Sequence, residues 1–320
     1  HAVALAHEIG LPAEQVRPLF NEFKDKTPLV AHVNPNADWD MEDFHKAGGV
    51  PRVMKAIERV LNTDCLTVTG KTVKENLESY NFLFPEDPNV IRGWDDAFEP
   101  TGGLGVMHGN LAPDSCVAKP SGILPKNRIF TGPARVFDGE RAYVKALEDD
   151  LVKPGDVAVI RYEGPKGGPG AREMGFVLKM MKGKNLMDKV AVITDGRYSG
   201  TNNGCFVGHV SPEAAEGGPI AIIRDGDMIT IDTVEERAVT LHLSDEEIAA
   251  RLAASPEHDV CVLRIEEGDF GCEEHRDPPR LWLLTETAAG ERRSLELPEP
   301  RVEALGLAEG YTCCFADLHP

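Results

Sequence analysis

Short apolar runs bounded by turn residues recur through residues 104–245 and limit the architectures open to this part of the chain. The runs are Leu104–His108, Val157–Arg161, Val190–Thr194, Ile220–Ile223 and Met228–Asp232. Each is strand-sized, and glycine, aspartate or proline lies nearby. Runs of this length in this setting predict β-strands. Two helices, at Gly139–Asp150 and Glu173–Met181, interrupt them, so we expect a barrel-like β domain with flanking helices.

The rest of the chain differs in pattern from this strand-rich region. Residues 1–95 show mainly helical periodicity, and proline, glycine, asparagine and aspartate cluster within residues 80–103, which is typical of a linker. We therefore expect one domain in residues 1–95 and a second, β-rich domain in residues 96–255. Residues 256–320 form a tail of uncertain role, in which Val260–Ile265 and Arg280–Glu286 could be strands of a small additional unit.

Charge and cysteine usage exclude several classes of protein. The chain has 53 Asp and Glu against 34 Lys and Arg, a net charge of −19, which argues against nucleic acid as a partner. No stretch of about 20 apolar residues suggests a membrane span. The seven cysteines are scattered and include no C-x-x-C pair, which disfavours a zinc site, a dithiol motif or a disulfide framework. We expect a cytoplasmic protein that binds a small molecule.

A strand that leads into a serine flanked by glycines is the strongest chemical signal. Val192–Thr194 is followed by Asp195, Gly196 and then Ser199-Gly200-Thr201. Glycines let the backbone turn tightly and expose the hydroxyl. The alternative is a strand–turn with a capping serine. A hydrolase nucleophile elbow is disfavoured, because G-x-S-x-G is absent.

A glycine-rich loop in front of a predicted helix is the second signal. Gly164–Gly170 contains four glycines, and Glu173 follows at the expected start of the helix. Free amides in such a loop can bind an anion or a metal-bound ligand. It is not a Walker A loop, since no G-K-[ST] follows. Glu173 could be a ligand of a hard metal ion, or simply an acid that favours the helix dipole.

Two further glycine-containing segments have mainly structural interpretations. In Gly208–Pro219, His209 could be a structural hydrogen-bonding residue, Ser211 a helix cap and Glu213 a first-turn acid. Gly102–Pro113 is interpreted as strand, tight turn and strand at the start of the second domain.

Together these four segments resemble the C-terminal half of the IlvD/Edd dehydratase family. The similarity continues through three more segments, which are Met41–Pro51, Asp64–Thr72 and Thr131–Phe137. Seven motifs in the same order make the resemblance specific, and it covers roughly residues 1–250. It implies an α/β fold: residues 1–95 as the C-terminal part of an α/β/α cluster-binding domain, and residues 96–255 as a swivelling β-barrel-like domain of the β/β/α type.

The resemblance also implies an activity and its cofactors. Family members remove water from a 2,3-dihydroxy acid, either a branched-chain acid or a sugar acid, to give a 2-keto acid. They use an iron–sulfur cluster, usually [2Fe–2S], and Mg²⁺ as Lewis acids, and they are homodimers or homotetramers. Ser199 is then the base, Glu173 an Mg²⁺ ligand, and Thr201, Arg197 and Gly200 substrate-binding residues.

The cluster ligands are expected upstream of His1, since none of the seven cysteines in this sequence corresponds to them. Ala171 stands where methionine is more usual, and the chain from about residue 256 does not resemble the family. The alternative is a non-catalytic binding or regulatory module derived from the same family. Retention of Ser199, Glu173 and the glycine-rich loop argues against that alternative.

Overall fold

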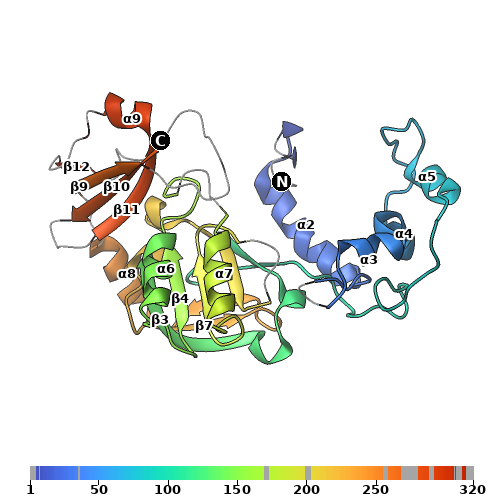
Figure 1. Cartoon of the computed structure of the whole chain (residues 1–320), viewed down its shortest axis with the longest axis horizontal. Helices are drawn as coiled ribbons and strands as arrows, with labels where there is room; N and C mark the ends of the chain where they lie inside the picture. Colours follow the sequence, from blue (N-terminus) through green and yellow to red (C-terminus); the bar gives the residue numbers. More distant parts are fainter. Residues whose placement is uncertain are drawn as a thin grey trace. The chain divides into compact units, whose positions relative to one another are not determined.

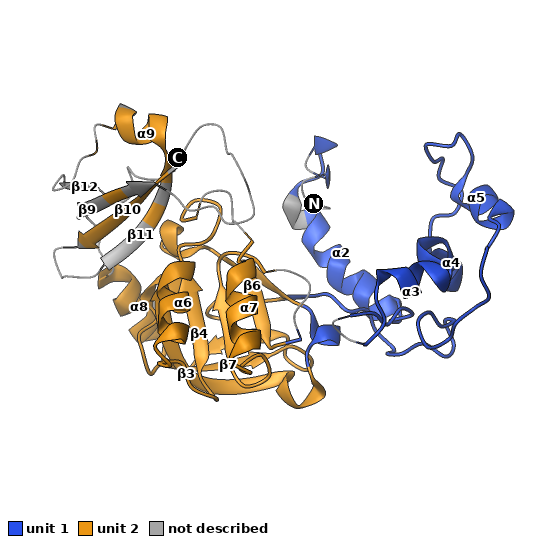
Figure 2. Cartoon of the chain, viewed as in Figure 1, with its two compact units in different colours: residues 1–106, 119–123, 200–203 blue, residues 107–118, 124–199, 204–320 orange. Residues whose placement is uncertain are grey.

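The structure is a computed structural model. It describes residues 5–6, 8–34, 37–168, 173–198, 203–254, 259–267, 280–287, 292–305, 307 and 312–314. The chain divides into two compact units, shown in different colours in Figure 2. Unit 1 is built mainly from residues 1–106, and unit 2 from most of the remaining chain. Among the described residues, no helix combines the length and apolar character needed to cross a membrane.

Unit 1 consists of short helices joined by long connections (Figure 1). The helices are α2 (Ala13–Lys26), α3 (Met41–Lys46), α4 (Gly49–Ala56), η1 (Glu58–Val60) and α5 (Val73–Ser79). Capping boxes begin α3 and α5, formed by Asp40 with Asp43 and by Thr72 with Glu75. In the described residues of this unit, segments away from the helices form isolated β-bridges. The predicted α/β/α layering is therefore not confirmed.

Unit 2 is organised by an eight-stranded sheet in the order β1-β2-β6-β5-β4-β3-β7-β8. The strands are β1 (Gly105–Met107), β2 (Ser115–Ala118), β3 (Ile129–Asp138), β4 (Val157–Arg161), β5 (Ala191–Thr194), β6 (Phe206–Ser211), β7 (Met228–Asp232) and β8 (Ala238–Leu241). Strands β3, β4, β5 and β6 are parallel, whereas β2, β7 and β8 pair antiparallel with their neighbours. The strands buried on both faces have the continuous apolar sequences expected of such positions.

The two ends of this sheet meet, so it is nearly closed. His108, the residue after β1, forms a bridge with Ala238, the first residue of β8. The Asn110 side chain then donates to the carbonyl of Leu241 (2.8 Å) and accepts from its amide (2.7 Å). A Cβ at Gly109 would lie 2.1 Å from the carbonyl oxygen of Val239, so the close approach requires glycine. The structure thus confirms a nearly closed, barrel-like sheet, but not the detailed β/β/α description of the domain.

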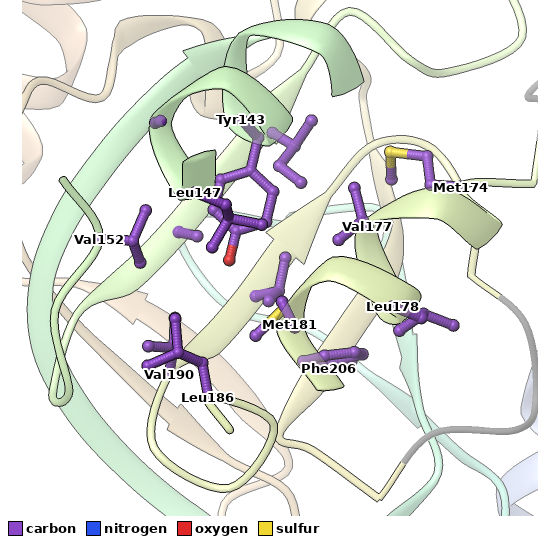
Figure 3. Packing of buried hydrophobic residues seen from close by; sticks show 14 residues of the cluster. Tyr143, Leu147, Val152, Met174, Val177, Leu178, Met181, Leu186, Val190 and Phe206 are labelled. Atoms are coloured by element: carbon purple, nitrogen blue, oxygen red, sulfur yellow. The ribbon is translucent and has the colours of Figure 1, made fainter. Parts of the chain in front are cut away.

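Helices α6 (Glu140–Glu148) and α7 (Gly175–Gly183) pack side by side over the parallel strands. Their apolar faces, with residues from β4, β5 and β6, form the core shown in Figure 3. Tyr143, Leu147 and Met181 are completely buried there. Removing such large apolar surfaces from water is the main favourable contribution to folding, so this core fixes the strands whose ends carry the candidate site.

Helix α8 (Asp245–Ala254) is capped by Ser244, whose hydroxyl accepts from the Glu247 amide at 3.2 Å. The short 3-10 helices of unit 2 are η3 (Pro125–Asn127), η4 (Ala214–Glu216) and η5 (Pro219–Ile222), whereas η2 (Pro120–Gly122) is part of unit 1. The strand predicted at Ile220–Ile223 is therefore wrong. Pro219 occupies the first turn of η5 and favours its helical backbone, and periodicity alone does not distinguish a short buried strand from a helical turn.

The residues beyond α8 form a second, antiparallel sheet in the order β11-β10-β9-β12. Its strands are β9 (Asp259–Glu267), β10 (Arg280–Thr287), β11 (Arg292–Pro298) and β12 (Thr312–Cys314), and α9 (Glu299–Ala304) packs against β10 and β11. The predicted small β unit is confirmed. The guanidinium of Arg141 on α6 lies 4.2 Å from the centroid of the Trp282 ring on β10, which ties this sheet to the larger one.

Candidate functional site

The carboxyl ends of β4, β5 and β6 lie at one edge of the sheet, because the three strands are parallel. Each strand runs directly into a glycine-containing segment: residues 162–168, 195–198 and 212–218. In α/β sheets, ligands bind in the crevice outside the carboxyl ends of the strands. The predicted site residues that the structure describes, Glu173 and Arg197, lie in this region.

Asp195 is the first residue after β5, and its side chain is almost completely buried, with the residue 2% exposed. Its carboxylate accepts three backbone N–H groups, from Tyr162 (3.0 Å), Glu163 (2.9 Å) and Ala214 (2.9 Å). Burial raises the pKa of this carboxyl to about 6, although the three amides favour the charged form and oppose the rise. One acidic side chain thus joins the segments after all three strands.

Glu213, in the segment that follows β6, has a similar role. It is 5% exposed, and its two oxygens accept from the amides of Lys166 (2.8 Å) and Gly167 (2.9 Å). Burial raises the pKa of Glu213. A Cβ at Gly164 would lie 2.3 Å from the Glu213 carboxylate, so the glycine-rich loop is held closely against this acid. The sequence pattern predicts Glu213 in a first helical turn, whereas its side chain binds the loop.

Two more buried acids accept backbone amides at the starts of the neighbouring helices. The Glu163 carboxylate accepts from the amide of Glu140, the first residue of α6. The Glu140 carboxylate in turn accepts from the Val177 amide (3.4 Å) in the first turn of α7. The first amides of a helix lack partners within the helix and carry positive partial charge, so acids are favourable there. These contacts link the end of β4 to both covering helices.

Glu173 and Arg197 are brought together by the backbone. They form a parallel bridge, and the Met174 amide donates to the Arg197 carbonyl at 3.1 Å. One Arg197 nitrogen lies 3.8 Å from a Glu173 carboxylate oxygen, with 44% and 46% of the two side chains exposed. Because α7 begins at Gly175, Glu173 is not in the predicted helix Glu173–Met181. The bridge holds Glu173 in an extended backbone, so the helix begins later than the periodicity indicates.

The segment before Ser199 is anchored on both sides. The Gly196 carbonyl accepts from the His209 amide at 2.8 Å, and the half-buried Tyr198 ring lies 5.1 Å from that of Phe206. A Cβ at Gly196 would lie 2.8 Å from the Cβ of Glu163. Ser199, Gly200 and Thr201 lie outside the described residues, so their predicted roles stay predictions.

His209 and Ser211 take up other positions than those expected from the sequence. His209 has a left-handed backbone, with φ of 55°, and its ring is exposed. Partial desolvation and the nearby Arg197 lower the pKa of its imidazole. Ser211 is not a helix cap, because it belongs to β6 and its hydroxyl donates to Asp114 at 3.1 Å. Residues before Pro212 are biased towards an extended backbone, which suits a strand end.

Sequence patterns do not identify the acids at this edge other than Glu173 and Glu213. Asp195 lies within a motif but carries no predicted role, and Glu163 and Glu140 do not stand out. One signal is available: an aspartate directly after an apolar strand and before glycine is well placed to accept amides from neighbouring loops. Nothing in the sequence specifies which amides those are.

The described residues do not make up a site for an iron–sulfur cluster or a complete site for Mg²⁺. Among them, no group of three or more His, Cys, Asp or Glu side chains could hold a metal ion. Cys116 and Cys205 are buried, which raises the pKa of both thiols to about 12, and Cys65 is exposed in unit 1. Thiolates are the cluster ligands, so buried Cys116 and Cys205 do not fit one, and Cys65 belongs to no group of three or more potential ligands among the described residues. Glu173 fits the role of a single hard-cation ligand, because its carboxylate is half exposed.

Comparison with known proteins places these motifs in one family. Residues 89–271 match the model of the dihydroxy-acid/6-phosphogluconate dehydratase C-terminal domain, and residues 1–76 match the corresponding N-terminal domain. The chain is 49% identical over 255 residues to a dihydroxy-acid dehydratase of Lachnospira eligens, and this match covers 79% of the chain and 45% of the relative.

Two other relatives give a similar picture. The chain is 45% identical over 254 residues to a dihydroxy-acid dehydratase of Acetivibrio thermocellus, and 44% identical over 257 residues to one of Methanosarcina barkeri. These matches cover 79% of the chain, and 45% and 46% of the two relatives. The chain therefore spans a little under half the length of the curated relatives it matches. With more than half of its residues matching the family's C-terminal model, the chain belongs to the dihydroxy-acid/6-phosphogluconate dehydratase family.

Proposed function

We propose that this chain forms a portion of a hydro-lyase that removes water from a 2,3-dihydroxy acid to give a 2-keto acid. The observation that carries the proposal is the pairing of Glu173 with Arg197 at the carboxyl ends of the parallel strands. Arg197 precedes Ser199 by two residues in the sequence. A carboxylate and a guanidinium at that edge suit a substrate that carries both hydroxyl groups and a carboxylate. The relatives are named dihydroxy-acid dehydratases, which favours an acid with only the two hydroxyl groups over a polyhydroxy sugar acid.

In this proposal Ser199 takes the proton from C2 of the substrate. The electrons of the broken C2–H bond form the C2–C3 double bond as the C3–O bond breaks, and the departing hydroxide takes up the proton that Ser199 removed, which gives water and restores the serine alkoxide. The resulting enol tautomerises to the 2-keto acid. A serine hydroxyl is a poor base, so it needs a cationic neighbourhood that favours its alkoxide. Arg197, on the same segment, supplies positive charge there and can also bind the substrate carboxylate.

Glu173, Thr201 and Gly200 have supporting roles in the proposal. Glu173 would be one ligand of Mg²⁺, and Thr201 and Gly200 would contact the substrate. A metal cofactor would supply Lewis-acid stabilisation of negative charge. The described residues complete neither an Mg²⁺ site nor a [2Fe–2S] site.

The test compares the native-length protein with a Ser199→Ala variant, each prepared without oxygen and supplied with Mg²⁺. Production of 2-keto acid is measured from a panel of branched-chain dihydroxy acids and sugar acids. We expect turnover on the branched-chain acids, and a decrease of about 100-fold or more in Ser199→Ala, because a positioned general base contributes at least that much.

Ser244→Ala is the matched control, since it removes a serine hydroxyl that caps α8 and lies outside the candidate site. It should lower stability slightly and leave turnover of the folded protein unchanged. Equal turnover in Ser199→Ala and wild type would move the base elsewhere. Absence of turnover on every acid, from protein that holds its cofactors, would remove the dehydratase proposal.

A further inference from the structure

The buried carboxylate of Asp195 contacts three segments that come from separate places in the sequence. Its amide donors lie 33 and 32 residues before it, at Tyr162 and Glu163, and 19 residues after it, at Ala214. These donors lie in the segments that follow β4 and β6, and Asp195 itself follows β5. Apart from the strand ladders, this side chain is thus a direct link among all three strand ends.

The packing around Asp195 leaves little room for the segments to shift. A Cβ at Gly196 would lie 2.9 Å from the Glu163 carbonyl oxygen, and one at Gly168 would lie 2.6 Å from the Glu163 Cα. Backbones that approach this closely can be held only if their polar groups are paired, because an unpaired buried amide is costly. Asp195 supplies that pairing for the amides on either side of Tyr162.

The segment that begins at Asp195 leads directly to the proposed base. Thr194 accepts the Gly196 amide at 3.0 Å, and the Arg197 carbonyl accepts the Met174 amide at 3.1 Å. Residues 195, 196 and 197 are therefore each hydrogen-bonded to other parts of the unit, at successive positions before Ser199. A small displacement at Asp195 would be passed along this segment to the residues that follow it.

From this geometry, and on the basis of the proposed function, we infer that Asp195 is a positioning residue. Its carboxylate ties the glycine-rich loop and the segment after β6 to the segment that carries Ser199, and so fixes the approach of Ser199 to the substrate. Asp195 acts through these backbone contacts and does not touch the reacting atoms. Glu213 supports the same arrangement through the Lys166 and Gly167 amides.

The decisive variant is Asp195→Asn, which keeps the size of the side chain but replaces one acceptor oxygen with a donor. We expect kcat of the native-length protein to fall about 100-fold, because a misplaced catalytic group costs about that much. KM should change less than about threefold, since uniform binding of the substrate is not altered. Hydrogen exchange of the Tyr162, Glu163 and Ala214 amides should quicken about tenfold, because each loses its acceptor or its alignment.

Asp156→Asn is the matched control. Asp156 is a buried aspartate at the other end of β4, and it accepts one turn amide, from Lys153, at 2.8 Å. This variant should lose some stability but keep kcat and the exchange rates at Tyr162, Glu163 and Ala214. A merely structural role for Asp195 would make the two variants alike in kcat.

Ala214→Pro tests the same link if Asp195→Asn does not fold. It deletes a single amide donor at the first residue of η4, where proline is favoured and the preceding Glu213 is already extended. We expect a smaller fall in kcat with unchanged KM. If kcat in Ala214→Pro equals that of wild type, the inference is overturned.

The exchange measurement separates this inference from the proposed function. If wild type turns over no dihydroxy acid but Asp195→Asn still quickens exchange at the three amides, the dehydratase proposal fails and the link between the strand ends stands. If wild type is active while Asp195→Asn matches Asp156→Asn in both kcat and exchange, the positioning role fails and the dehydratase proposal stands.

Discussion

The acidic side chains at the two ends of the parallel strands in unit 2 differ in the reach of their contacts. At the amino ends, Asp227 pairs with Arg251 and Asp188 with Lys126 at 3.1 Å, while Asp156 accepts only a local turn amide. The carboxyl ends also hold an ion pair, Asp138 with Arg161, but there Asp195 and Glu213 accept backbone amides from segments distant in the sequence. A charge pair fastens two elements to each other, whereas a carboxylate that accepts several amides sets the path of loops. We conclude that the amino ends chiefly serve stability and the carboxyl ends chiefly shape the candidate site.

The largest effect on stability is expected at the amino end, from Arg251→Ala. Arg251 and Asp227 form two hydrogen bonds, at 2.6 and 3.2 Å, and their side chains are only 12% and 11% exposed. Removing one partner of a buried pair leaves an uncompensated charge and costs about 4 kcal/mol. Urea unfolding of the purified chain measures this loss.

The exposed pair of Lys145 with Asp149 (2.8 Å) provides the contrast, because solvent screens it and Lys145→Ala should leave the free energy of unfolding nearly unchanged. Turnover per folded molecule should be unchanged in Arg251→Ala. A loss of turnover per folded molecule in Arg251→Ala would contradict the assignment of stability to the amino ends and of site geometry to the carboxyl ends.

The next largest effect is a pH dependence at the carboxyl end. Burial raises the pKa of Asp195 from its ordinary value of 3.8 to about 6, so the folded protein binds this proton more tightly than the unfolded chain. The resulting stabilisation is fully present below pH 3.8 and is lost as the pH rises through about 6. The stability of wild type relative to Asp195→Asn should therefore fall by about 3 kcal/mol over this interval, since one pKa unit corresponds to about 1.4 kcal/mol.

Urea unfolding of wild type and Asp195→Asn at a series of pH values gives this difference in the free energy of unfolding. Contributions from groups that titrate alike in the two proteins cancel in the difference. The pKa of the adjacent Glu213 is raised as well, so Glu213→Gln made in both backgrounds isolates the contribution that belongs to Asp195. A difference that grows with rising pH would contradict the assigned direction.

The smallest effect compares two glycines, and it sharpens the contrast in packing. Gly196→Ala would place a Cβ 2.8 Å from the Cβ of Glu163, and overpacking of this kind costs about 2 kcal/mol. A Cβ at Gly183, at the end of α7, meets no atom within 4 Å. Gly183→Ala should therefore be neutral or stabilise by up to about 1 kcal/mol. Equal unfolding midpoints for the two variants in urea would show that the carboxyl end tolerates displacement.

Elements with a strong local signal can be predicted from the sequence. The buried strands β4, β5 and β7 follow directly from apolar runs between turn residues, and Ser244 is recognisable as a helix cap. The strand expected at Ile220–Ile223 is absent because four apolar residues after Gly-Pro suit a helical turn equally well. Periodicity places Glu173 on a helix because its pairing with Arg197 is non-local.

The candidate site is predictable only to a limited extent, because its contacts are also non-local. Motifs identify Glu173 and Arg197, which the structure brings together, but no local pattern marks Asp195 as the acceptor for amides 33 residues before it and 19 residues after it. Such a contact exists only once the order of β4, β5 and β6 in the sheet is fixed. Fold-level arrangement, rather than residue type, gives this acid its role.

The double hydrogen bond between the Asn110 side chain and the Leu241 backbone has a consequence for how the sheet is assembled. An amide side chain that donates and accepts at once matches the backbone of a single residue, as a neighbouring strand would. Sliding β8 by one residue would break both bonds and turn its buried face outward. Asn110 therefore fixes the register at which the two ends of the sheet, β1 and β8, meet. A fixed register gives the nearly closed sheet a single arrangement, and it leaves less exposed strand edge that could pair with another chain.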